Sequence, residues 1–138
     1  MGHDGCGRPE ADDGGRNPGA DIVGDSPESV IPLMVDGGVA TWQEDGATEG
    51  MTQFRPRKHD AGMAAHITLF KGVVHGWDLA APTGQMLDVS SEVEDAVLLI
   101  AQMLCNDKPF RTDVSVADSA SSLVKTLGLT GRDPNWST

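Results

Sequence analysis

Aromatic side chains are scarce in this sequence: tyrosine is absent, and the aromatic residues together make up 4% of the chain. A core in these 138 residues must therefore be built from Val, Leu, Ile, Met and Ala. A chain of this length can bury about two-thirds of its unfolded surface without cross-links. The aliphatic composition favours a single helical domain over a β-sandwich.

Basic residues are also few, with 10 lysines and arginines against 21 acidic residues and a formal net charge of −11. A negative field of this size repels the phosphates of nucleic acids and the headgroups of anionic membranes. Apolar runs are short as well, and none reaches the roughly 18 residues that a membrane-spanning helix needs. We therefore expect no nucleic-acid partner and no membrane partner.

Cysteine occurs only at Cys6 and Cys105, which is too few for a disulfide framework in a chain of this length. Two free thiols in a reducing cytoplasm are favoured over a bridge between them. The first residues lack the basic and apolar regions of a secretion signal. The sequence thus predicts a cytoplasmic protein.

The beginning of the chain differs in composition from the rest. Residues 1–25 are rich in glycine and aspartate and carry too little apolar surface to offset their ordering entropy. This predicts a disordered tail, followed by a helical domain over residues 26–138. Ser26-Pro27-Glu28 is typical of a helix start. Pro32 and Gly37-Gly38 weaken the helix that follows, so we expect it to be bent or marginal.

The strongest helical pattern covers residues 61–81, where apolar side chains recur every three or four positions and His66 lies on the same stripe. A second helix is predicted to begin at Ser91 as N-cap, with Glu94 three residues later as its capping-box partner. A last short helix is predicted over about residues 118–127. Each of these helices has an apolar face that needs a partner, which predicts a helical bundle.

Short extended segments are expected in the loops of this all-α fold. Residues 51–54 and 110–116 have the composition of extended chain, and Val114 and Val116 alternate with polar neighbours. Between the first of these segments and the long helix lies a basic cluster, Arg55-Pro56-Arg57-Lys58-His59. We interpret this cluster as a solvated loop.

Polar side chains on one flank of the 61–81 helix are the candidates for chemistry. Lys71, His75 and Asp78 lie three and four residues apart and share this flank. One interpretation is a metal ion on His75, with Asp78 as second ligand or as the group that orients its ring. At Lys71, where a helix presents a second ligand, an ammonium has no lone pair to donate. The residues alone therefore favour a hydrogen-bonded histidine at His75 and a partly buried core histidine at His66.

Several motifs together resemble one family. His75-Gly76-Trp77-Asp78-Leu79-Ala80, followed by Thr83-Gly84-Gln85, is similar to the signature helix of the DinB-like metal-binding proteins related to mycothiol-dependent maleylpyruvate isomerase. The family's preceding helix and its exit resemble Gly24-Asp25-Ser26-Pro27, Ala40-Thr41-Trp42 and Asp45-Gly46-Ala47. The closing segment resembles Leu123–Leu127 followed by Gly131-Arg132-Asp133-Pro134-Asn135-Trp136. The resemblance covers roughly residues 24–136.

The resemblance implies a four-helix bundle that holds one divalent ion, zinc or nickel, at one end. In the better understood members the ion binds a low-molecular-weight thiol, mycothiol in actinobacteria, for isomerase or S-transferase chemistry. A metal-bound thiol loses its proton and becomes a nucleophile. Only His75 matches a family ligand, because Lys71 stands where the second ligand belongs. Asp78 and His66 are the remaining candidate ligands.

The family's first helix, which carries another histidine, is expected to be absent here, since the glycine-rich tail occupies its place. Without that helix, an apolar groove along Phe70, Val73 and Trp77 is expected to be exposed, so that a second copy or a partner chain covers it. Two functions remain: a metal-dependent thiol transferase or isomerase with His75 as ligand, and a non-catalytic relative that acts by association. An apolar small molecule in the groove is a third hypothesis.

Overall fold

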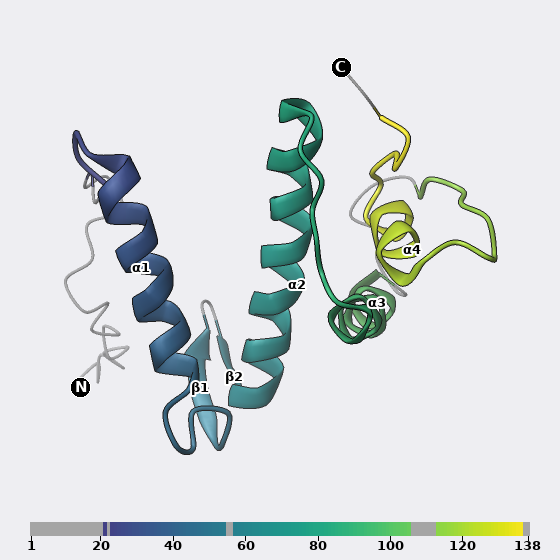
Figure 1. Cartoon of the computed structure of the whole chain (residues 1–138). Coiled ribbons are helices and arrows are strands. Elements are labelled where there is room, and N and C mark those ends of the chain that lie inside the picture. The colour runs from purple at the N-terminus through teal and green to yellow at the C-terminus, as the bar shows by residue number, and fades with distance from the viewer. Residues whose placement is uncertain (1–20, 22, 55–56, 106–112, 137–138) are drawn as a thin grey trace, which may run out of the picture. The chain divides into compact units, whose positions relative to one another are not determined.

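The computed structural model describes residues 21, 23–54, 57–105 and 113–136 (Figure 1). Its elements in chain order are α1 (Pro27–Trp42), β1 (Met51–Phe54), β2 (Arg57–Asp60), α2 (Ala61–Ala80), a 3-10 turn (Ala81–Thr83), α3 (Ser91–Cys105) and α4 (Ser122–Leu129). Helices dominate, so the all-α prediction is confirmed at this coarse level. No helix in these ranges is long and apolar enough to cross a membrane.

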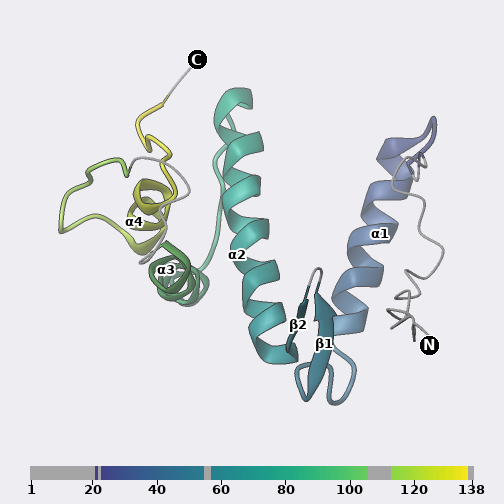
Figure 2. The same cartoon turned by 180° about the vertical axis from the view of Figure 1, so that it is seen from behind.

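The chain divides into two compact units, residues 1–40 and 41–138, and each is described by itself. The tail predicted over residues 1–25 lies mostly outside the described residues. In the first unit, α1 begins where Ser26 was expected to start it, because the Ser26 carbonyl accepts the N–H groups of Ser29 and Val30 at 3.1 Å each. The helix runs through Pro32 and Gly37-Gly38 without a break (Figure 2). None of its sixteen residues, all of them described, is buried.

The second unit opens with an antiparallel hairpin in which Met51 pairs with Asp60 and Phe54 with Arg57. The prediction of an extended piece at residues 51–54 is confirmed. The prediction that the basic cluster forms a solvated loop is wrong in part, since residues 57–59 belong to β2. Residues 55–56 of the cluster lie outside the described residues. The hairpin leads directly into α2, because the Asp60 carboxylate accepts the Met63 N–H at 3.0 Å and caps the helix.

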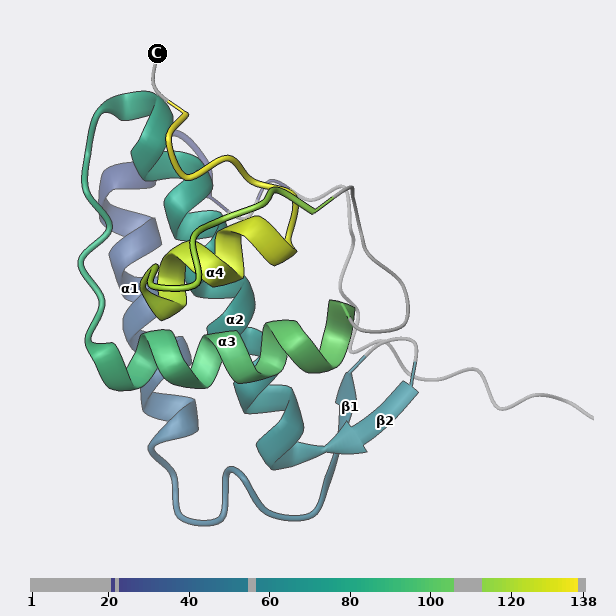
Figure 3. The same ribbon diagram turned by 90° about the vertical axis from the view of Figure 1, so that its right-hand side faces the viewer.

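Helix α2 covers the predicted range to within one residue and supplies half of the core. Its buried Phe70, Val73 and Val74 pack with Val97, Ile100 and Ala101 of α3. Phe70 and Val73 were expected to line an exposed groove, and the structure corrects this, because α3 covers them. Figure 3 shows α3 crossing α2 steeply, with α4 lying against α3. A bundle of the DinB-like type therefore stays a prediction.

The start of α3 corrects the predicted cap by one residue. The hydroxyl of Ser90, rather than that of Ser91, accepts the Val93 N–H, at 3.4 Å. The carboxylate of Glu94 does not close a capping box; it accepts the N–H of Leu123 in the first turn of α4, at 3.2 Å. This acidic side chain joins α3 to α4 instead of stabilising its own helix end.

Helix α4 starts later than predicted, with Ser121 as its cap, so the expected beginning near residue 118 is wrong. The segment before it, residues 113–117, is pinned to the helix: the N–H of Val114 donates to the carbonyl of Gly128 at 3.0 Å. A Cβ on Gly128 would lie 2.6 Å from the Val114 carbonyl oxygen. The absence of a side chain at this glycine therefore permits the close approach. The rest of the extended piece predicted at 110–116 lies outside the described residues.

Candidate functional site

The polar site of this protein lies where the C-terminal turn meets the end of α2. Arg132 donates two hydrogen bonds to the carboxylate of Asp78, from Nε to Oδ1 and from Nη2 to Oδ2, each 2.7 Å long. Its third guanidinium nitrogen, Nη1, donates to the carbonyl of Thr130 at 3.1 Å. Such a bidentate pair is among the strong forms of an arginine–carboxylate contact, because two charge-assisted hydrogen bonds form at once.

Backbone contacts also hold Arg132 in position beside Asp78. The N–H of Arg132 donates to the carbonyl of Leu127 in α4 at 2.9 Å. Gly131 adopts a φ of 73°, which turns the chain back over the end of α4. This turn brings the Arg132 side chain to Asp78 of α2.

His75 completes the group from the exposed side. Its Nδ1 donates to Asp78 Oδ2 at 3.1 Å, as expected for residues three apart on a helix. The hydrogen bonds from Arg132, and secondarily the one from His75, hold the pKa of Asp78 below its ordinary value. The same pairing raises the pKa of Arg132. The His75 side chain is 67% exposed, whereas those of Asp78 and Arg132 are 36% and 23% exposed.

The donor set does not fit the divalent ion that the family resemblance implies. Both oxygens of Asp78 are occupied by a bidentate arginine, so this carboxylate is engaged as a salt-bridge partner. Lys71 carries an ammonium, which cannot act as a ligand. A catalytic zinc site needs about three protein ligands. Across the described part of the chain, no group of three or more His, Cys, Asp and Glu side chains is placed to hold an ion.

His66 is separated from this group and is not the core histidine that was expected. It is exposed, and its Nδ1 donates to the carbonyl of Gly62 at 2.8 Å. His66 and His75 are nine residues apart on one helix, which places them about 13 Å apart along the axis and on opposite faces. The structure therefore brings together His75 and Asp78, two of the three predicted site residues, and excludes His66.

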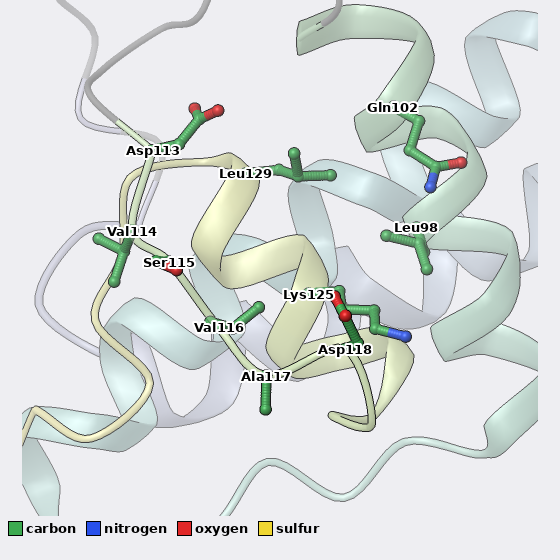
Figure 4. A pocket seen from close by; sticks show the side chains of 10 residues that line it. All are labelled: Leu98, Gln102, Asp113, Val114, Ser115, Val116, Ala117, Asp118, Lys125 and Leu129. Atoms are coloured by element: carbon green, nitrogen blue, oxygen red, sulfur yellow. The ribbon is translucent and has the colours of Figure 1, made fainter.

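Next to the Asp78–Arg132 pair is a shallow pocket of about 440 Å³. Its lining is mostly apolar and combines two tryptophans from distant parts of the sequence; the lining residues are Trp77, Ala81, Gly84, Gln85, Met86, Leu87, Leu123, Pro134 and Trp136. A second pocket of about 380 Å³ lies between α3, α4 and residues 113–118 (Figure 4). Neither the pairing of the tryptophans nor the second pocket was predicted, because each depends on contacts between remote segments.

Comparisons with known proteins do not identify the chain. No protein-family model matches it, and searches of curated proteins and of solved structures found no match either.

Proposed function

We propose that this protein is a non-catalytic helical domain that acts by association with a partner, and that it is a relative of the DinB-like family without that family's metal chemistry. The observation that carries the proposal is the double hydrogen bond from Arg132 to Asp78. Asp78, the acidic side chain that contacts His75, is thereby engaged in a structural ion pair.

The cost of recruiting Asp78 to a metal ion supports this proposal. The carboxylate would have to leave a half-buried guanidinium that is only 23% exposed. Breaking a charge-assisted pair costs more when the remaining charge is partly desolvated. His75 would then still be short of the roughly three ligands that a catalytic ion requires.

The surface of the second unit also favours an association function. Eight large apolar side chains are exposed on it: Trp42, Met51, Leu69, Leu79, Met86, Leu99, Met103 and Trp136. Apolar surface left exposed to this extent is available for contact with a partner. Self-association is the simplest form, and light scattering on a size-exclusion column measures it: a homodimer is the expected species.

Metal analysis of the purified protein tests the proposal. We expect well under one divalent ion per chain after incubation with zinc or nickel and desalting, and an unchanged melting temperature after chelation. The variants His75→Ala and His66→Ala form a matched pair, since both histidines are exposed on α2 and each makes one local hydrogen bond. One bound ion per chain that is lost in His75→Ala and kept in His66→Ala would overturn the proposal.

One observation favours a second candidate, a metal-dependent thiol transferase or isomerase. Nδ1 of His75 is bonded to a carboxylate, which is how metal-binding histidines are commonly oriented. For this candidate, a cytoplasmic low-molecular-weight thiol of the mycothiol type is the co-substrate. Its test is thiol-dependent turnover of an electrophilic substrate in the presence of zinc or nickel, with His75→Ala as the inactive control.

A further inference from the structure

The pocket between α3, α4 and residues 113–118, called the groove below, is lined by side chains from three segments of the chain. In Figure 4, Leu98 and Gln102 of α3 form one wall and residues 113–118 the other, with Lys125 and Leu129 of α4 between them. The volume of about 380 Å³ falls in the range of ligand sites in proteins. Groups from three segments converge on it.

The wall made by residues 113–117 is an extended backbone held at a fixed position. The Val114 N–H bond to Gly128 anchors it, and the side chain of Val116 lies over the same glycine. The structure shows no hydrogen bond from the backbone N–H groups of residues 115–117 to any other residue that it describes. An extended peptide laid beside this wall can supply such bonds, as in recognition by strand addition.

The charges of the groove select the peptide's composition. Asp113 and Asp118 stand at the two ends of the wall, both are exposed, and neither forms an ion pair with a described residue. The chain as a whole carries a charge of −11, which adds to their attraction for cations. Lys125 is half-buried between the walls, where its ammonium can donate to a peptide carbonyl.

We propose that this groove binds an extended peptide from a partner protein, with apolar side chains facing Leu98 and Leu129 and basic side chains facing Asp113 and Asp118. The proposal rests on the association function proposed above and names its partner class. Asp113 and Asp118 are five residues apart, at the two ends of the wall. Two basic side chains five positions apart in the peptide therefore match them.

The probe is the labelled hexapeptide acetyl-Lys-Val-Thr-Val-Thr-Lys-amide, with the same peptide carrying Glu for Lys as its counterpart. We expect the basic peptide to bind and the acidic one to bind at least about tenfold more weakly. Ala117→Trp, an exposed position that lines the groove, fills it and should reduce binding by at least about tenfold. Asp118→Asn should weaken binding about two- to fivefold, and Asp88→Asn, which removes an exposed carboxylate outside the groove lining, should leave it unchanged.

Amide chemical shifts locate the site: on titration with the probe, changes should be confined to the lining residues of α3, α4 and residues 113–118. Circular dichroism and the melting temperature confirm that each variant is folded. No binding of the basic peptide, equal loss in Asp88→Asn and Asp118→Asn, or shifts centred on Trp77 and Trp136 would each overturn the proposal. The same holds if the wild type is a dimer that Ala117→Trp converts to a monomer, since the occupant is then a second copy. The peptide titration does not depend on metal content, which tests the proposed function. The two proposals can therefore be contradicted independently of each other.

Discussion

Arg132 donates two hydrogen bonds of 2.7 Å to the carboxylate of Asp78, which lies 54 residues earlier in the sequence. This pair joins the C-terminal turn to the last part of α2, and it occupies both carboxylate oxygens of Asp78. An acid at this position beside a histidine resembles half of a metal site in the sequence, whereas in the fold it is the acceptor of a structural ion pair.

Replacement of Asp78 by Asn should destabilise the protein. One charge-assisted bond is lost and the guanidinium of Arg132 is left without its counter-charge, so we expect a loss of about 1–2 kcal/mol, reduced from the value for a buried pair because Asp78 is partly exposed. Urea denaturation measures this loss, and Asp88→Asn is the matched control. If Asp78→Asn is as stable as the control, the pair contributes nothing to stability.

The Asp78–Arg132 pair should also make stability depend on acid pH. The pKa of Asp78 is lowered in the folded state, principally by the hydrogen bonds from Arg132, relative to about 4 in the unfolded chain. Its contribution is therefore complete above pH about 4 and is lost as the pH falls through the lowered pKa. The difference in unfolding free energy between the wild type and Asp78→Asn should be constant near neutral pH and shrink below about pH 4. A difference that stays constant down to pH 2 would contradict this assignment.

Two glycines allow a matched test of the 113–117 segment. Gly128→Ala places a Cβ 2.6 Å from the Val114 carbonyl oxygen, which should cost about 1–3 kcal/mol as the segment is pushed away. Gly72→Ala introduces the same methyl group in an exposed part of α2 where nothing lies within 4 Å, and it should stabilise the helix by up to about 1 kcal/mol. Thermal unfolding compares the two, and equal effects would show that the close approach at Gly128 is not maintained in solution.

The cap of α3 can be assigned by two serine variants. Ser90→Ala removes the hydroxyl that accepts the Val93 N–H, which should cost about 1 kcal/mol. Ser91→Ala changes the first helical residue and should alter stability by less than about 0.5 kcal/mol. If a denaturation experiment shows a larger loss of stability for Ser91→Ala than for Ser90→Ala, Ser91 is the cap.

Local patterns predicted the helices because helices are built from local contacts. The stripe of apolar residues over 61–81 defines α2 almost to the residue, since the same periodicity determines which side chains α3 can cover. His66 lies on that stripe and was therefore assigned to the core, but it is exposed and bonds the carbonyl of Gly62. Periodicity gives the direction of the buried face, but not how far along the helix that face is covered.

The features that escaped prediction depend on partners remote in sequence. His75 and Asp78 are three apart, so their contact follows from helix geometry, whereas no local rule connects Asp78 to Arg132. Ser90 and Ser91 carry the same hydroxyl, and the sequence could not choose between them. Glu94 was assigned to a capping box because the alternative acceptor role, at the start of α4, exists only after α3 and α4 have packed.

The attachment of α2 at both ends has a mechanical consequence. At its start, the helix continues from a paired hairpin, whose Gly50 carbonyl accepts the Ala61 N–H at 2.9 Å. At its other end, the clip is the guanidinium of Arg132, close to the C-terminus. Asp78 directly follows Trp77, and Arg132 lies four residues before Trp136. The ion pair therefore tethers the segment that carries one tryptophan of the neighbouring pocket to the helix that carries the other.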